Sequence, residues 1–263
     1  MAEVIQHAPG TPSYIDLSTT DPDAAQSFYA ELFGWEYDEQ PTDTGTTYIT
    51  ARLGGKSAAG MMEQPADMRE MGVPPCWNSY VTVDDADAAA TRAEEAGGSI
   101  LQPVFDVMDA GRMAVLADPT GGVICVWEPK ESIGAELVDE PGTLCWNELM
   151  TADTAAASAF YEKVFGWRAQ ELPMEDTPYT MYAVGDRPVG GAMNPPMEGI
   201  PPHWGIYFNV ADTDAVVEKA RSLGARVVAE PMDTPPGRMA ALVDPQGAAF
   251  SVIEADPDYD PTA

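Results

Sequence analysis

Basic residues are scarce in this sequence. Lysine and arginine together number 13, against 43 aspartates and glutamates, which gives a formal net charge of −30. Such a chain repels a phosphate backbone wherever its surface is not locally basic, so we expect no nucleic-acid partner. Histidine is scarcer still, because only His7 and His203 occur. A metal centre built mainly from imidazole ligands is therefore excluded.

Cysteines and long apolar runs are also few. Cys76, Cys125 and Cys145 are widely spaced and form no CxxC pair, which argues against a disulfide framework and a zinc knuckle. The longest apolar stretches are strand-length, far short of the roughly 20 residues that cross a bilayer. The first ten residues lack the basic and apolar regions of a secretory signal. We therefore expect a cytoplasmic protein without membrane association.

What the sequence does contain is a repeat. Three segments of the first half return in the second: FYAELFGW (28–35) as FYEKVFGW (160–167), PPCWNSYVTVDD (74–85) as PPHWGIYFNVAD (201–212), and GRMAVLADPTGG (111–122) as GRMAALVDPQGA (237–248). The repeat predicts two domains, at residues 1–128 and 143–255. A linker at residues 129–142 joins them, and an acidic C-terminal tail follows at residues 256–263.

A shorter repeat lies inside each half. Four times a strand-like run ends in Asp, an amphipathic stretch of about three turns follows, and Gly closes it, at residues 21–34, 85–97, 153–166 and 212–224. An aspartate N-cap and a terminal glycine are typical of a capped helix. Three further strand-like segments follow each helix. We therefore predict an α+β fold of four βαβββ units.

Side chains alternate along the predicted strands. Ile15 and Leu17 should face the helix, while Tyr14 and Asp16 face the opposite side of the sheet. Asn78 and its neighbours alternate in the same way in the second unit. Large polar and aromatic groups on the face away from the helices predict a sheet curled around a cavity, with the helices on its outer face.

These units resemble the vicinal oxygen chelate superfamily, which contains glyoxalase I, bleomycin-resistance proteins and extradiol dioxygenases. The resemblance rests on DLSTTDPDAAQSFYAELFGW in the first unit and DPTGGVICVWEP in the second, and it covers nearly the whole chain. It is strongest for tandem actinobacterial members, among them a culture-filtrate antigen and antibiotic-pathway hydroxylases. It implies two tandem domains of this type, each with a curled mixed sheet.

The resemblance also implies where a metal would bind, because metal-dependent members take His, Gln or Glu ligands from the first and last strands of paired units. The matching positions hold Tyr14, Asn78, Cys125, Trp146, Gly205 and Ser251, with a less certain position near Glu63 and Asn194. Four suitable donors are absent from either half, whichever units pair. We therefore expect no metal and no other cofactor.

Asp16 and Glu148 occupy matching positions on the cavity side of each half's first strand. Desolvation in an apolar cavity would raise the carboxyl pKa, so each is a candidate general acid or base; a purely structural carboxylate is the alternative. Aromatic rings with polar edges suit a flat ligand or simply fill the cavity. The first half is favoured, because Trp146 can fill the second cavity. The candidate ligand-binding residues are Tyr14, Asn78, Tyr80, Cys125, Trp127, Trp146, Tyr207 and Ser251.

The favoured function is metal-independent binding of a small, largely apolar or aromatic organic ligand by a monomer or homodimer. By resemblance, the setting is natural-product biosynthesis or resistance, through sequestration or a cofactor-free reaction. One alternative is a metal-dependent lyase or dioxygenase that uses unexpected ligands such as Glu63, Asp16 or Glu148. The other is a protein-interaction role with cavities filled by their own side chains.

Overall fold

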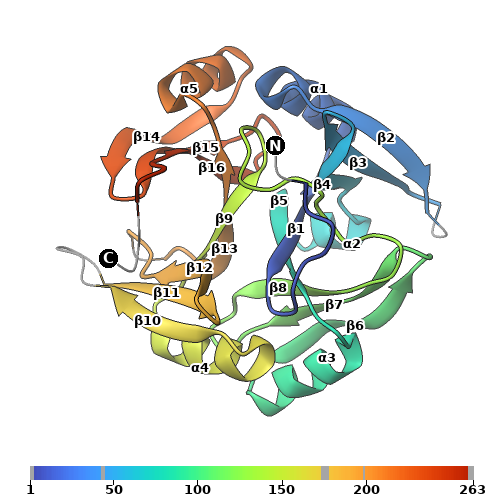
Figure 1. The fold of residues 1–263 in the computed structure, drawn as a ribbon. Coiled ribbons are helices and arrows are strands. Elements are labelled where there is room, and N and C mark those ends of the chain that lie inside the picture. Colours follow the sequence, from blue (N-terminus) through green and yellow to red (C-terminus); the bar gives the residue numbers. More distant parts are fainter. Residues whose placement is uncertain (1–2, 43–44, 173–177, 198, 260–263) are drawn as a thin grey trace.

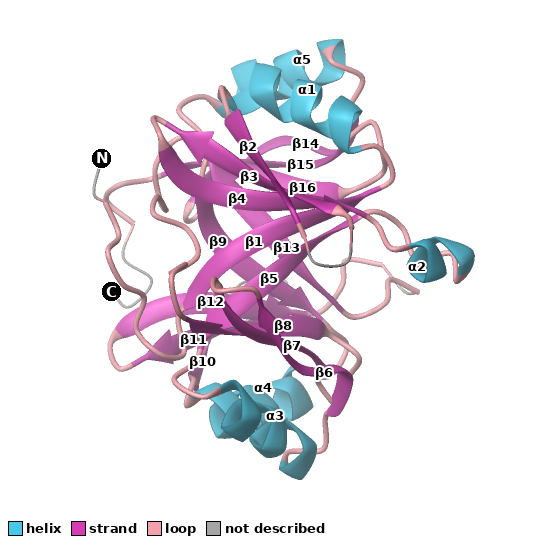
Figure 2. Cartoon of the chain, turned by 90° about the vertical axis from the view of Figure 1, so that its right-hand side faces the viewer, coloured by secondary structure: helices cyan, strands magenta, loops and turns pink. Residues whose placement is uncertain are grey.

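The computed structural model describes residues 3–42, 45–172, 178–197 and 199–259. Each half of the chain forms one eight-stranded sheet, and the four long helices gather at two opposite ends of the molecule (Figures 1 and 2). Each half contains two βαβββ units, as the sequence predicts. Among the described residues, no helix is long and apolar enough to span a membrane.

The first sheet is mixed and open. At its centre β1 (Pro12–Thr19) and β5 (Cys76–Thr82) are antiparallel, and each runs parallel to the last strand of its own unit. Those last strands are β4 (Lys56–Glu63) and β8 (Val123–Pro129), flanked by β3 (Thr47–Leu53), β2 (Glu36–Pro41), β7 (Gly111–Ala117) and β6 (Ser99–Val107). The helices are α1 (Pro22–Phe33), α3 (Ala86–Glu95) and the short α2 (Ala66–Glu70), which the sequence pattern did not predict.

The second sheet repeats this order. Its central antiparallel strands are β9 (Leu144–Met150) and β13 (His203–Asn209), which run parallel to β12 (Arg187–Met193) and β16 (Ala249–Ala255). The outer strands are β11 (Tyr179–Val184), β10 (Arg168–Leu172), β15 (Gly237–Val243) and β14 (Arg226–Thr234), and the helices are α4 (Thr154–Phe165) and α5 (Thr213–Ser222). Units one and two therefore share one sheet, and units three and four share the other.

The four long helices have the predicted ends. Their N-caps accept a hydrogen bond from the backbone N–H three residues on, at Asp21, Asp85, Asp153 and Asp212. The glycines that follow the helices have φ of 77°, 86°, 73° and 95°, at Gly34, Gly97, Gly166 and Gly224. This left-handed conformation suits glycine, which has no Cβ. The prediction that a glycine closes each of the four helices is confirmed.

The helix-covered faces of the two sheets meet and form two shared cores. In one, Phe28 and Tyr29 of α1 pack with Val217 of α5. In the other, Ala89 of α3 packs with Phe160 of α4. Each sheet thus combines neighbouring units, whereas the cores combine unit one with four and unit two with three. Figure 2 shows the two helix pairs at opposite ends.

Each core contains a tyrosine from the repeated FY motif that links the domains. The Tyr29 hydroxyl donates to the Asp244 carboxylate at 3.0 Å and accepts from the Trp77 indole at 3.2 Å. The equivalent residues of the other core, Tyr161, Asp118 and Trp204, repeat both bonds at 2.8 Å. The repeated FY, PPxW and DPxG motifs therefore meet across the domain junction, where they build the frame of the protein.

Candidate functional site

The face of the first sheet opposite its helices, which we call the inner face, carries a buried carboxylate. Asp16 lies beside Asn78 in the register of β1 and β5, and it is 2% exposed. One carboxylate oxygen accepts from the Asn78 amide at 2.8 Å, and the other accepts from the Tyr80 hydroxyl at 2.7 Å. Ile15 lies in the core on the opposite face, so these polar groups converge as strand alternation predicts.

Burial sets the protonation behaviour of this carboxyl group. Desolvation raises the pKa of Asp16, and hydrogen bonds from Asn78, Tyr80 and Tyr48 oppose part of that rise. Burial also raises the pKa of Tyr80, which therefore remains a hydroxyl donor. Asp16 can consequently hold a proton at higher pH than an exposed aspartate, which is the property required of a general acid.

A tyrosine that strand alternation did not identify covers each carboxylate. Tyr48 of β3 lies over Gly60 of β4 so closely that a Cβ at Gly60 would lie 2.0 Å from the Tyr48 hydroxyl oxygen. Tyr179 stands in the same relation to Gly191 in the second domain, also at 2.0 Å. Both pairs recur in the internal repeat, so a comparison of the two halves could have identified them.

The deep part of the first inner face is filled by its own side chains. Tyr80, Cys125 and Trp127 are all less than 9% exposed and form one cluster, against which Tyr14 packs. The Trp127 indole donates to the Ser132 carbonyl at 2.9 Å. The first-half candidates therefore do meet on one face, but most of them contact each other.

The second domain places Glu148 where the first has Asp16. Glu148 is 6% exposed and accepts from the Tyr207 hydroxyl at 2.8 Å. The Trp146 indole donates to the Tyr179 hydroxyl at 2.9 Å, which fixes that ring beside the carboxylate. Burial raises the pKa of Glu148, opposed by hydrogen bonds from Tyr207 and Tyr179 and by the nearby His203.

The two inner faces differ in the residue beside the carboxylate. Asn78 of the first domain is matched by Gly205, which pairs with Glu148 in the register of β9 and β13. A Cβ at Gly205 would meet no atom closer than the Glu148 carbonyl oxygen at 3.6 Å. Trp146, Tyr207 and Ser251 are partly exposed. The second inner face therefore has space beside its carboxylate that a side chain occupies in the first.

The residues at the implied metal positions do not fit a divalent metal. Trp146 and Gly205 offer no ligand. Glu63, from the alternative set, forms an ion pair with Arg69 at 2.6 Å. In the described part of the chain, no three His, Cys, Asp or Glu side chains lie close enough together to hold an ion. Both histidines bond to backbone carbonyls: His7 to that of Ala135 at 2.7 Å, and His203, which lies near Glu148, to that of Pro201 at 2.9 Å.

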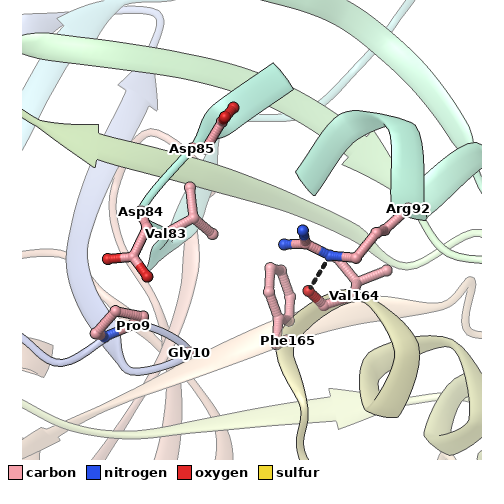
Figure 3. Close-up of a pocket in the computed structure, with 8 residues that line it drawn as sticks. All are labelled: Pro9, Gly10, Val83, Asp84, Asp85, Arg92, Val164 and Phe165. Atoms are coloured by element: carbon pink, nitrogen blue, oxygen red, sulfur yellow. Dashed lines mark hydrogen bonds between the residues drawn. The ribbon is translucent and has the colours of Figure 1, made fainter. Parts of the chain in front are cut away.

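Two small cavities lie at junctions between the two domains, which we call seams, and most of the predicted residues are outside them. One of about 160 Å³ lies between the end of α4 and the start of α3 (Figure 3). The other, of about 150 Å³, lies beside the start of β9 and is lined by His7, Trp146 and Arg187. Trp146 is the one candidate ligand-binding residue that lines either of these two cavities.

Four βαβββ units in two open sheets, with a buried carboxylate on each inner face, define a tandem protein of duplicated domains. The chain belongs to the Glyoxalase/Bleomycin resistance protein/Dioxygenase superfamily, whose family model matches residues 11–126 and 133–252. The resemblance noted in the sequence is thereby confirmed.

Relatives of similar length support this assignment. CFP32 of Mycobacterium tuberculosis, a protein named provisionally as a glyoxylase, is 46% identical over 96% of this chain and 97% of its own. The anthracycline biosynthesis protein DnrV of Streptomyces peucetius is 37% identical over 96% of both chains. The Mn(II)-bound glyoxalase of Novosphingobium aromaticivorans shares the fold, with a TM-score of 0.65 and 15% identity over 94% of this chain and 83% of its own.

Proposed function

We propose that the protein binds a small, largely apolar or aromatic organic ligand on the inner face of its second domain, without a metal. The observation that carries this proposal is the pairing of a buried, hydrogen-bonded Glu148 with the unfilled space at Gly205. By strand register and alternation, Trp146 and Tyr207 lie on the same face as this position, and both residues are partly exposed. Such rings bind a flat ligand by stacking, while a carboxylate accepts a hydrogen bond from its hydroxyl or N–H group.

The sequence favours the first domain as the binding domain, whereas the structure favours the second. Trp146 was expected to close the second cavity, but its indole is held by Tyr179 and leaves the Gly205 position open. In the first domain, Asn78 occupies the matching space and bonds to Asp16. The closely packed Tyr80, Cys125 and Trp127 favour a structural role for that inner face.

The chemistry of the site allows both sequestration and catalysis. Because burial raises its pKa, Glu148 can donate or accept a proton at the bound ligand without any cofactor. The relationship to DnrV, an anthracycline biosynthesis protein, supports a setting in natural-product biosynthesis or resistance. The Mn(II)-bound structural neighbour shows that the fold can hold a metal, but the donors here do not match that use. Elemental analysis of the purified protein should therefore find no stoichiometric transition metal, and one ion per domain would contradict the proposal.

Calorimetric titration with 2-naphthol, a flat probe with one hydroxyl donor, tests the binding site. Gly205→Asn installs the residue of the first domain and should abolish binding by filling the space, and Glu148→Gln should weaken it by removing the charged acceptor. Asn78→Gly is the matched control and should leave the affinity unchanged. Melting temperatures confirm that the variants fold. Equal affinity in all four proteins, or loss only in Asn78→Gly, would contradict the proposal.

A further inference from the structure

The cavity at the seam between α3 and α4 carries opposite charges on its two sides. Figure 3 shows the Arg92 guanidinium on one side of the opening and the Asp84 carboxylate on the other. Between them lie apolar groups, chiefly the Phe165 ring and Val83. The cavity measures about 160 Å³, a size that accommodates a benzene-sized molecule. It is separate from both inner faces, so a ligand in this cavity is independent of the proposed function.

The guanidinium is held in place without being neutralised. Arg92 donates through Nε to the Val164 carbonyl at the end of α4, at 3.1 Å, which leaves its two terminal nitrogens facing the cavity. Across the described residues, no carboxylate lies within 4.0 Å of Arg92, and the Asp84 carboxylate has no hydrogen-bond or ion-pair partner. Two unpaired charges of opposite sign therefore line one cavity, beside Asp85, whose carboxylate accepts from the Ala88 N–H at the start of α3. Five of the nine arginines, by contrast, form ion pairs with acids.

The other seam provides an internal comparison. At the junction of α5 and α1, the internal repeat replaces Arg92 by Lys219 and Asp84 by Ala211, while Phe33 matches Phe165. The apolar part of the seam is thus kept, and the carboxylate is lost. The N-cap aspartate, Asp85 or Asp212, is common to both seams, whereas the second carboxylate, that of Asp84, occurs in the α3 and α4 seam alone, so the fold does not require it.

We infer that this cavity binds a small zwitterion, namely an α-amino acid with a short apolar side chain. Its carboxylate would receive two hydrogen bonds from the terminal nitrogens of Arg92, the geometry in which arginine binds carboxylates best. Its ammonium would lie toward Asp84, and its side chain would contact Phe165. A simple anion is repelled by Asp84 and a simple cation by Arg92, so a ligand that carries both charges is preferred.

The test is an NMR titration of the full chain with L-valine, following the amide signals of Gly10 and Phe165. Two probes each lack one charge: 3-methylbutanoate has no ammonium, and 2-methylpropylamine has no carboxylate. L-Valine should give saturable shifts, and each single-charge probe should bind at least about tenfold more weakly. Arg92→Gln should weaken L-valine binding by at least about tenfold as well.

Two further variants separate the charges from general effects on folding. Asp84→Ala, at an exposed position, reproduces the other seam and should weaken L-valine while sparing 3-methylbutanoate. Lys219→Gln is the matched control in that other seam and should leave L-valine binding unchanged. Absence of saturable shifts up to roughly 50 mM L-valine would overturn the inference. So would equal binding of the three probes, or unchanged affinity in both Arg92→Gln and Asp84→Ala.

Discussion

The inner faces of the two sheets share the same groups around a buried carboxylate but differ in the residue beside it. Each has a carboxylate on its first strand, a tyrosine hydroxyl that donates to it from the neighbouring strand, and a second tyrosine over a glycine. In the first domain, Asn78 completes the hydrogen bonding of Asp16. In the second, Gly205 leaves the space beside Glu148 unfilled. The position beside the carboxylate thus holds a side chain in the first domain and open space in the second, and the packed Tyr80, Cys125 and Trp127 fill the first face further.

The contacts at the seams between the domains, in contrast, are nearly the same in both cores. There Tyr29 and Tyr161 make the same pair of hydrogen bonds, to matching Asp and Trp residues, in both cores. These side chains are buried among aromatic rings from both domains. Duplication has therefore preserved the residues that join the domains more closely than the residues that line the inner faces.

The largest effect is expected from truncating the seam tryptophans. Trp77→Ala and Trp204→Ala each remove a buried indole and its hydrogen bond to a core tyrosine. Each should lower the free energy of unfolding by about 3–5 kcal/mol, as for other buried tryptophans. Denaturant unfolding checks both values. A difference above about 2 kcal/mol between the two variants would show that the seams are not equivalent.

A smaller loss of stability, of similar size in both domains, is expected when the glycines beneath Tyr48 and Tyr179 are replaced. Gly60→Ala and Gly191→Ala place a methyl group where the hydroxyl of Tyr48 or Tyr179 lies, so each ring must move. We expect a loss of about 1–3 kcal/mol in each variant. Thermal unfolding of the two proteins measures it. Retention of wild-type stability would mean that neither ring needs its present position.

The smallest effect concerns pH. Burial raises the pKa of Glu148 above its unfolded value, so ionising this group costs stability as the pH rises from the unfolded to the folded pKa. Glu148→Gln removes this cost, and its stability relative to wild type should rise with pH above about 4.3 and then level off. Asp16→Asn should show a rise of the same sign, because burial raises the pKa of Asp16 as well. Urea unfolding between roughly pH 4 and pH 8 checks both variants; stability relative to wild type that falls with pH in either variant contradicts this account.

Local features of the fold could be predicted from the sequence because they have local causes. Aspartate N-caps and left-handed glycines act within one helical turn, and strand alternation placed Asp16 and Glu148 on the faces where they lie. The short helix α2 was missed, since its five residues carry no side-chain cap. The pairing of units depends on contacts between distant segments, so it could not be read from a single strand or helix.

The sequence identifies most residues of the candidate site, but it does not show whether their side chains fill the inner face or leave it open. Alternation identified Tyr80, Trp127 and Tyr207, but it does not tell whether rings fill a cavity or line it. That outcome depends on Tyr48 and Tyr179, which reach the carboxylates from the third strand of their units. It also depends on Gly205, which was judged as a poor metal ligand and not as a source of space.

The most direct test of the central claim locates the bound ligand. In an NMR titration of the wild-type protein with 2-naphthol, the amide signals of Glu148, Gly205 and Tyr207 should shift together and saturate, while those of Asp16 and Asn78 stay unchanged. This result would place the ligand in the space that distinguishes the second domain from the first. Saturable shifts at Asp16 and Asn78 alone, or shifts confined to the helices, would contradict the account.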